Sequence, residues 1–172
     1  RYTLDGAVPN ETSPVYSQPI QINSTTVVKA RMFYAGQLPG PTVTNTYFIN
    51  EGFDQRGLPV LSLSSDPDYF FAADSGLYVQ DFKPTWEYPV HLEFYEPDGL
   101  AGFHHDAGIQ VGGQNAWILP QKLLNIYSRG QYGSGHFDYQ LFPDNPRTRF
   151  GDIVLRCSGN DWSYTMFRDG LM

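Results

Sequence analysis

The residues best suited to chemistry lie between Gly108 and Lys122. An alternating apolar segment runs from Gly108 into the glycine pair Gly112–Gly113, a polar turn follows, and Lys122 opens a second alternating segment. Glycines let a backbone approach a bulky anion closely, and a lysine on a neighbouring strand can present its charge to a phosphate. The pattern suggests a hairpin that faces a nucleotide, although a β-hairpin with a solvated lysine has the same pattern.

Other side chains capable of chemistry lack a spacing that would bring them together. In His104–His105–Asp106, adjacent side chains on a strand point to opposite faces, so we do not expect a shared metal ion. Asp66, Asp68 and Asp74 lack the spacing and the distal glutamate of a calcium-binding loop, and solvated turn aspartates are the simpler interpretation. The sequence therefore predicts no metal site.

The single cysteine and the three tryptophans have structural explanations. Cys157 has no partner for an internal disulfide, and its strand-like surroundings predict a buried structural thiol. Trp86, Trp117 and Trp162 could stack on sugars, but places in the core or in packed turns are the more common use of tryptophan. The chain contains no zinc-protease helix motif, no Walker loop and no Gly-x-Ser-x-Gly elbow.

The composition predicts strands separated by turns. The 172 residues suit one ordinary domain or two small ones, and 16% of them are aromatic, with 17 glycines and 13 prolines. A net charge of −7 argues against nucleic-acid binding, which needs a basic face. No apolar run is long enough to span a bilayer. The chain begins at Arg1 and stops at Met172 inside an expected helix, so we expect a piece of a larger polypeptide.

Residues 1–48 are expected to form a small, partial β-sandwich. Thr25–Phe33 is rich in β-branched residues and alternates inward Val and Ala with outward polar groups. Val43–Phe48 is a second expected strand, and Pro19–Ile22 alternates as well. Several short strands separated by turns are typical of a sandwich.

Four motifs in this segment also point to a known domain. They are Tyr2–Gly6, Ser13–Tyr16, Thr25–Arg31 and Val43–Tyr47. On these residues the segment resembles the C-terminal β-sandwich domain of chitobiases and β-hexosaminidases. The resemblance implies an accessory module of extracellular bacterial proteins, without an active site, whose first strand precedes Arg1.

A polar, glycine-punctuated linker is expected at residues 49–57, and a second domain at residues 58–172. Tyr88–Tyr95 is its clearest strand, with Val90, Leu92 and Phe94 on one face. Further alternating segments predict a mostly antiparallel sheet, a short helix after Asp66 and a terminal helix over 161–172. The expected fold class is therefore mainly β, with a small α+β component.

Segments spread along residues 58–172 match one protein family in order. They are Leu58–Leu63, Trp86, Pro89–Phe94, Gly108–Gly113, Pro120–Lys122, Tyr139–Asp144, Ile153–Arg156, Ser158–Asp161 and Arg168–Asp169. On these residues the segment resembles the spore coat protein H (CotH) kinase family. The resemblance implies an atypical protein-kinase fold, of which these residues form the N-terminal lobe, an antiparallel sheet with a terminal helix.

The kinase resemblance assigns a role to the glycine–lysine segment. Lys122 matches the family's lysine and Gly113 its turn glycine, so Gly112, Gly113 and Lys122 are expected to bind ATP, with Mg²⁺ in the full-length protein. The implied partners are a protein substrate and the remainder of the kinase domain beyond Met172. Because that remainder carries the catalytic aspartates, no catalytic residue is expected within residues 1–172.

The turn before Lys122 departs from the family. Asn115 and Ala116–Trp117 replace the family's Ser and Arg, and Gln121 replaces a basic residue, so fewer donors reach a nucleotide. This departure and the aromatic richness leave an alternative open, a non-catalytic β-rich module for adhesion or glycan binding. Both alternatives predict an exported bacterial protein, extracellular or at the cell surface.

Overall fold

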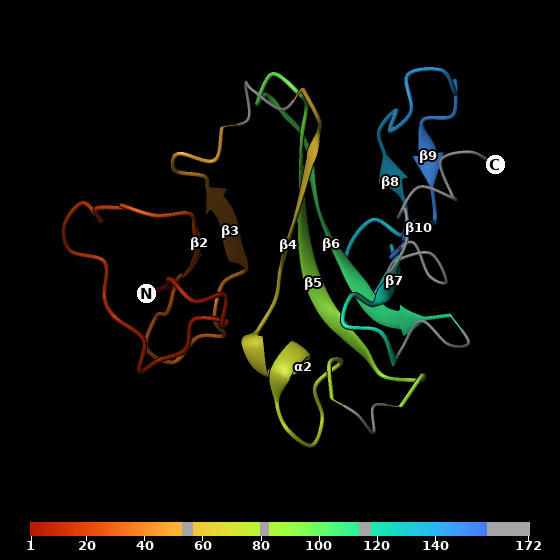
Figure 1. The fold of residues 1–172 in the computed structure, drawn as a ribbon. Coiled ribbons are helices and arrows are strands. Elements are labelled where there is room, and N and C mark those ends of the chain that lie inside the picture. Colours follow the sequence, from red (N-terminus) through yellow and green to blue (C-terminus); the bar gives the residue numbers. More distant parts are fainter. Residues whose placement is uncertain (53–56, 80–82, 114–117, 158–172) are drawn as a thin grey trace. The chain divides into compact units, whose positions relative to one another are not determined.

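The computed structural model describes residues 1–52, 57–79, 83–113 and 118–157. Over these residues the protein consists mostly of antiparallel strands, with little helix (Figure 1). The chain divides into two compact units: the first contains Arg1–Pro67 and His91–His105, and the second contains Asp68–Val90 and the chain from Asp106 onward. The mainly-β fold class predicted from the sequence is confirmed.

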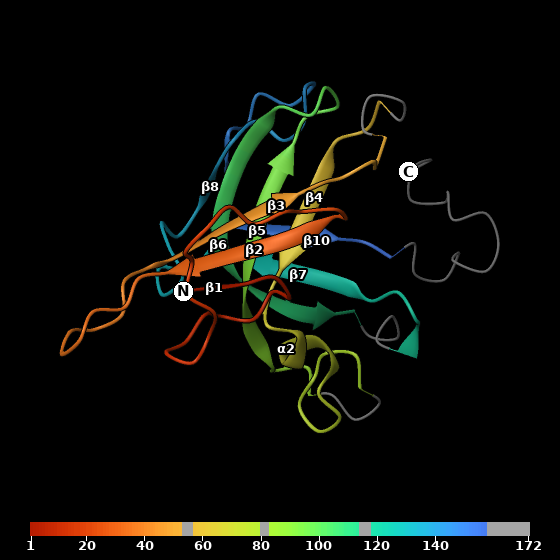
Figure 2. The same ribbon diagram turned by 90° about the vertical axis from the view of Figure 1, so that its left-hand side faces the viewer.

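The first unit contains a three-stranded antiparallel sheet in the order β1–β2–β3 (Figures 1 and 2). Its strands are β1 (Tyr2–Thr3), β2 (Thr26–Arg31) and β3 (Thr42–Tyr47). β2 and β3 are rich in Thr and Val, whose branched side chains favour extended backbone. The two strands pair along their whole length, from Thr26 opposite Tyr47 to Arg31 opposite Thr42. Both were predicted as strands, with ends that differ by two residues at most.

Two expectations for this sheet are wrong. Pro19–Ile22 is not a strand but part of the irregular loop between β1 and β2. The expected direction of the alternation along Thr25–Phe33 is also reversed, because Lys29 is 5% exposed whereas Ala30 is exposed. On β3 the polar Thr44 is likewise buried and Val43 exposed. The polar face is the buried one because Ser62 and Glu93, elsewhere in the same unit, supply hydrogen-bond partners to Thr46 on that face.

A second sheet has the strand order β10–β7–β6–β5–β4 (Figure 1). The pairs β4–β5, β6–β7 and β7–β10 are antiparallel. The strands are β4 (Val60–Ser64), β5 (Glu87–Tyr95), β6 (Ala101–Gly112), β7 (Leu123–Tyr127) and β10 (Asp152–Leu155). All five lie where alternating apolar segments predicted strands, so hydrophobic periodicity was sufficient to find them.

The remaining elements are short. Helix α2 (Pro67–Phe71) begins with a proline, whose fixed φ angle suits the first helical position, and was predicted in this place. β8 (Phe137–Asp138) and β9 (Arg149–Phe150) form a two-stranded antiparallel ribbon. The terminal helix predicted over 161–172 lies outside the described residues. None of the helices among the described residues is long and apolar enough to cross a membrane.

The two units have different interiors. Among the described residues, the buried apolar side chains are Leu77, Val90, Leu92, Phe94, Ala107, Ile109, Val111, Leu124, Ile126, Phe137 and Cys157. All of them except Leu92 and Phe94 belong to the second unit. The first unit instead buries polar side chains, including Lys29, Thr44 and Glu93. Val90, Leu92 and Phe94, which were predicted to share one face of β5, are all buried.

The finer divisions made from the sequence stay predictions. They are the boundaries at residues 1–48, 49–57 and 58–172, and part of the expected linker, residues 53–56, lies outside the described residues. The antiparallel sheet agrees with a β-rich second segment, but strand order and burial give no support for the kinase-like lobe in particular.

Candidate functional site

The predicted glycine–lysine hairpin forms as expected. β6 and β7 pair from Gly108 opposite Tyr127 to Gly112 opposite Leu123, so Lys122 directly precedes the residue that faces Gly112. Gly113 has a φ angle of +83°, a backbone conformation that non-glycine residues rarely adopt. The turn residues 114–117, where Asn115 and Ala116–Trp117 depart from the kinase family, lie outside the described residues.

The space over Gly112 is already filled by a neighbouring side chain. A Cβ atom placed on Gly112 would collide with the Asn125 amide nitrogen and would lie 2.7 Å from Leu123 Cδ2. Gly112 therefore lets the side chains of β7 lie close against β6. This close packing explains the glycine without a bound phosphate.

Lys122 directs its ammonium group into the protein. The residue is 8% exposed, and its Nζ donates a 3.3 Å hydrogen bond to the carbonyl of Leu119 and lies 5.4 Å from the centre of the Tyr78 ring. Burial lowers the pKa of Lys122 and raises the pKa of Tyr78. Lys122 is therefore not the solvated lysine of an ordinary β-hairpin. One of its three N–H donors, which a phosphate would need, already binds the Leu119 carbonyl.

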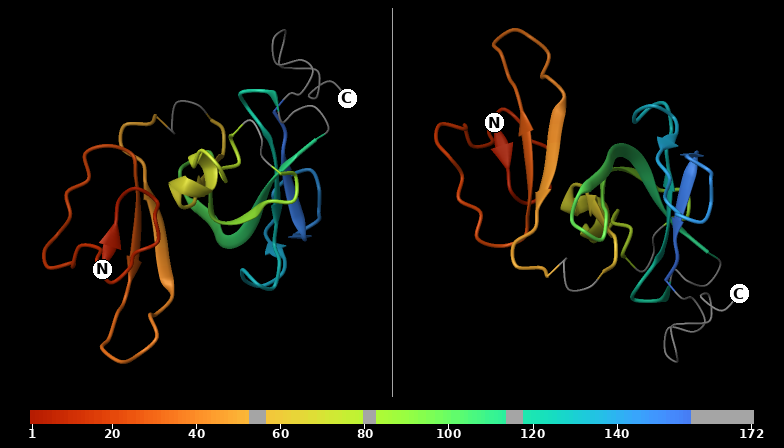
Figure 3. Two further views of the ribbon diagram at one scale, coloured as in Figure 1. Left: turned by 90° about the horizontal axis from the view of Figure 1, so that it is seen from below. Right: turned by 90° about the horizontal axis from the view of Figure 1, so that it is seen from above.

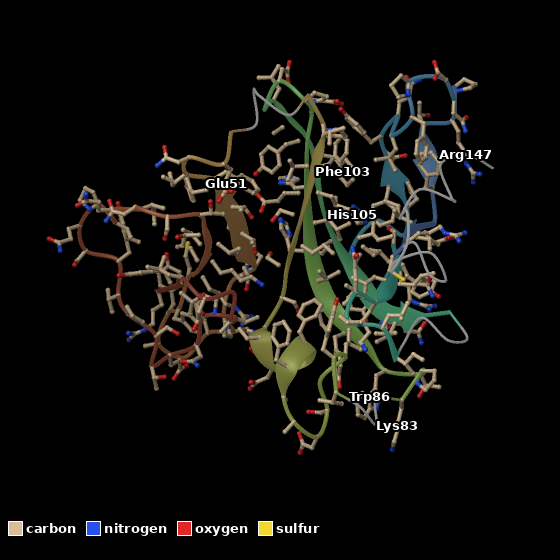
Figure 4. The ribbon with its side chains drawn as sticks, in the orientation of Figure 1. Glu51, Lys83, Trp86, Phe103, His105 and Arg147 are labelled. Atoms are coloured by element: carbon tan, nitrogen blue, oxygen red, sulfur yellow. The ribbon has the colours of Figure 1, made fainter. Side chains whose placement is uncertain are left out.

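The other candidates from the sequence do not assemble into a site. Among the described residues, no group of three or more His, Cys, Asp or Glu side chains is arranged to hold a metal ion. Cys157 is free and buried, as predicted. Trp86 lies in the loop before β5 with Lys83, to whose carbonyl its backbone N–H donates at 2.9 Å (Figure 4). Trp117 and Trp162 are outside the described residues.

A roomy hollow lies against the β1–β2–β3 sheet. It encloses about 750 Å³, a size typical of ligand pockets. Its walls are residues of the loop between β1 and β2, which leaves the sheet and returns to it (Figure 3), and residues of the sheet and its turns. They are Arg1, Tyr2, Tyr16, Pro19, Ile20, Ile22, Val28, Ala30, Arg31, Met32, Gly40, Pro41, Val43 and Tyr47.

Strand alternation places the apolar side chains in this hollow. Val28 and Ala30 on β2 share a face with Val43 and Tyr47 on β3, because Ala30 pairs with Val43 and alternate residues point the same way. Tyr16, from the loop, is 62% exposed, and Val43 and Tyr47 are exposed as well. The hollow is therefore an open apolar surface with aromatic rings.

Two arginines are the charged residues of the lining. Arg1 Nη1 donates to the carbonyl of Ser13 at 2.8 Å, and Arg31 Nε donates to the carbonyl of Gly40 at 2.7 Å. Strand alternation directs both side chains away from the face of Val28 and Val43, so the arginines lie at the rim of the hollow. A guanidinium group has five N–H donors, so each arginine keeps further donors at this rim. The arrangement can accept an apolar body that carries an anionic group.

The opposite, polar face of the sheet is closed by Glu93. Its Oε1 accepts the backbone N–H of Thr46 at 3.0 Å and the hydroxyl of Tyr95 at 2.9 Å, and its Oε2 accepts the Thr46 hydroxyl. The Thr46 and Ser62 hydroxyls also share a hydrogen bond of 2.8 Å. Burial and the bond to Glu93 raise the pKa of Tyr95. A hollow beside this cluster encloses only about 230 Å³, below the usual range for ligand pockets.

These features define a β-rich protein with an open apolar hollow in its first unit. Residues 1–47, which contain the whole lining of the hollow, match a family described as Fn3 associated. No curated protein and no solved structure matches the chain.

The family match bears on both resemblances noted in the sequence. It agrees with a β-sandwich-like domain of an extracellular protein, although the family is not the chitobiase and β-hexosaminidase domain that the sequence resembled. The resemblance of residues 58–172 to the CotH kinase family receives no support from these comparisons.

The hollow was not predicted, although the sequence contains the apolar residues that line it. The alternation of residues 25–33 was noticed, but its apolar side was assigned to the core. Tyr16 lies in one of the four family motifs, and Ile20 and Ile22 lie in the alternating stretch Pro19–Ile22, which predicts a strand. In the structure these residues form one wall of the hollow and the sheet forms the other.

Proposed function

We propose that this protein is a non-catalytic, β-rich binding module of an extracellular protein, which adheres to another protein through the hollow on the β1–β2–β3 sheet. The observation that carries the proposal is the exposed apolar lining of the hollow, within the residues that match the Fn3-associated family. Contiguous exposed apolar surface on a globular domain marks contact sites, and ligand pockets are mostly apolar with a few polar groups.

A protein partner suits the lining better than a sugar. Sugar hydroxyls need hydrogen-bond partners, because a buried hydroxyl without one costs roughly 1–3 kcal/mol. Polar side chains in the lining are limited to three tyrosine hydroxyls and two arginines, and the Ile, Val, Met and Pro side chains offer none. The tyrosine rings can stack on sugars, so glycan binding is the competing outcome to test.

The test compares an array of short apolar peptides with a glycan array, both probed with the 172-residue chain. Val43→Ser with Tyr47→Ser makes the hollow polar, and because both side chains are exposed the fold should remain intact. Val154→Ser on β10, 48% exposed and not part of the lining, is the matched control. We expect peptides to bind the parent chain and the control, and the double variant to lose most of that binding.

Two results would contradict the proposal. Saturable glycan binding that the double variant loses, with no peptide bound, would make the hollow a sugar site. Peptide binding that survives unchanged in the double variant would move the contact surface elsewhere.

A second proposal keeps the nucleotide assignment of Gly112, Gly113 and Lys122, with ATP and Mg²⁺ as ligands. It is supported by the pairing of β6 with β7, which brings Lys122 next to the glycine pair. To contact a phosphate, the ammonium group has to leave the Leu119 carbonyl and the Tyr78 ring. This requirement makes it the weaker of the two proposals.

Calorimetric titration of the chain with ATP and Mg²⁺ tests the nucleotide proposal. Lys122→Ala should weaken binding about tenfold or more, because a hydrogen bond to a charged group contributes roughly 1.5–3 kcal/mol. Lys83→Ala, at an exposed lysine, is the control. Equal affinities of the parent chain and Lys122→Ala would remove Lys122 from the site.

A further inference from the structure

Arg1 and Arg31 stand opposite each other at one end of the β1–β2 pair. The backbone nitrogen of Arg1 donates to the carbonyl of Arg31 at 2.8 Å, and the backbone nitrogen of Arg31 donates to the carbonyl of Arg1 at 2.9 Å. These two bonds continue the ladder in which Tyr2 pairs with Ala30. Two like charges at directly opposite positions destabilise a strand pair.

The structure compensates for this pair of positive charges only in part, through the Arg31 guanidinium, which lies 5.8 Å from the centre of the Phe33 ring. Neither arginine forms an ion pair with a carboxylate among the described residues, and the lining of the hollow contains no Asp or Glu. The chain as a whole carries a net charge of −7, so a cationic pair beside an apolar hollow is a local exception. Local arrangements that cost stability without an internal benefit are typical of functional sites.

We propose that the hollow selects protein segments in which a carboxylate stands beside apolar side chains, with Arg1 and Arg31 holding the carboxylate. This inference rests on the proposed function and names the chemistry of its partner. Charge complementarity is the reason: guanidinium groups present a planar fork of donors that fits a carboxylate, and each arginine here uses one side-chain donor on a backbone carbonyl.

Apolar surface and charge have separate tasks in this site. Val28, Val43 and Tyr47 lie on the same face of the sheet and can bury apolar side chains of the partner, which contributes affinity without direction. The arginines fix where the acidic residue lies and reject segments with a Lys or Arg in its place, because like charges at a contact are strongly unfavourable. Together they favour an acidic, apolar segment over a purely apolar one.

A pair of dyes tests the role of charge on the intact chain. 1-Anilinonaphthalene-8-sulfonate carries aromatic rings and one negative charge, and N-phenyl-1-naphthylamine has the same rings without the charge. We expect the chain to bind the anionic dye roughly tenfold more tightly than the neutral one. Raising NaCl from about 0.05 M to about 0.5 M should weaken binding of the anionic dye only.

Substitutions assign the preference to the two arginines. Arg1→Gln and Arg31→Gln should each reduce the preference for the anionic dye several-fold, and Arg31→Lys should keep part of it. Lys83→Gln removes the same charge from an exposed residue outside the hollow and should leave the preference unchanged. Circular dichroism checks each fold, and Arg1→Gln decides the matter if Arg31→Gln fails to fold.

The possible outcomes separate this inference from the proposed function. Equal binding of the two dyes, unaffected by the arginine substitutions, overturns the carboxylate preference and leaves the adhesion proposal standing. Dye binding that survives Val43→Ser with Tyr47→Ser shows that the dyes bind elsewhere and overturns the carboxylate preference of this hollow, while the peptide array still decides the adhesion proposal.

Matched synthetic peptides then identify the occupant. A capped Val-Ile-Asp-Tyr-Val peptide should displace the anionic dye better than its Asn version, and its Lys version should not compete. Competition by anionic oligogalacturonate with no competition by the Asp peptide would overturn the choice of a protein partner. Self-association of the chain in sedimentation velocity that displaces the dye would make a second copy the occupant and would overturn the choice of a different protein as the partner.

Discussion

Tyr95 shows how a single hydroxyl stabilises a buried carboxylate. Glu93 is 5% exposed and accepts three hydrogen bonds, one of which comes from the Tyr95 hydroxyl at 2.9 Å. Tyr95→Phe keeps the ring and its edge-to-face contact with Phe48 but removes this bond. We expect a loss of about 1.5–3 kcal/mol in the free energy of unfolding, measured by urea denaturation, because the lost bond is to a charged group.

The raised pKa of Tyr95 adds a pH signature to that comparison. Because the folded state holds the tyrosine proton more tightly than the unfolded state, the contribution of Tyr95 is complete below about pH 10 and is lost as the pH rises further. Tyr95→Phe lacks this component, so the stability difference between the two proteins should narrow above pH 10. If the difference in the free energy of unfolding stayed constant above pH 10, the pKa of Tyr95 would not be raised in the folded state.

Lys122 gives the opposite pH dependence. Burial lowers its pKa in the folded state, so between that pKa and its ordinary value the unfolded state binds more protons, and stability rises with pH. Lys122→Met removes this dependence. We expect the variant to match or exceed the parent at pH 7 by up to about 1 kcal/mol, with the difference shrinking toward pH 10. Lys83→Met, at an exposed residue, should show no such trend in urea denaturation at several pH values.

At the scale of elements, the β6–β7 hairpin depends on close contact between Gly112 and Asn125. Gly112→Ala places a Cβ atom against the ends of the Asn125 and Leu123 side chains, and because these can move aside we expect a cost of about 1 kcal/mol, the lower end for overpacking. Asn125→Ala removes the side chain that the new methyl group meets. A double-mutant cycle should therefore show that Gly112→Ala costs clearly less in the Asn125→Ala background. If the stability losses of the two single variants simply added up in the double variant, Gly112 would be required for another reason, such as its backbone conformation.

The hairpin also shows what the sequence could predict. Alternation from Gly108 into the glycine pair and from Lys122 onward predicted both strands, because periodicity is a local property that depends only on neighbouring residues. The burial of Glu93 could not be found in this way, since its partner Thr46 is 47 residues away. The same reason explains the error over Lys29, which was expected to point to solvent. Alternation predicts that a strand has two faces, but the partner that each face meets decides which of them is buried.

At the scale of the whole molecule, stability should depend mainly on the apolar core of the second unit. Ile109 on β6 is fully buried, whereas Val43 on β3 is 58% exposed. Ile109→Ala should cost about 2–5 kcal/mol because it leaves a cavity, and Val43→Ala should change stability by less than about 0.5 kcal/mol. Urea denaturation of both variants checks this contrast. A large loss from Val43→Ala would show that its side chain is buried in solution, and the open hollow would then be wrong.

The location of Glu93 limits the ways in which this protein can join other chains. β3 is the outer strand of its sheet, and the Thr46 amide that points outward is already satisfied by Glu93. An incoming polypeptide that extends the sheet by backbone pairing finds no free amide at this residue, so strand addition and fibre growth are blocked there. At this residue a neighbouring molecule is left to recognise side chains, and such recognition can be reversed without unravelling a sheet.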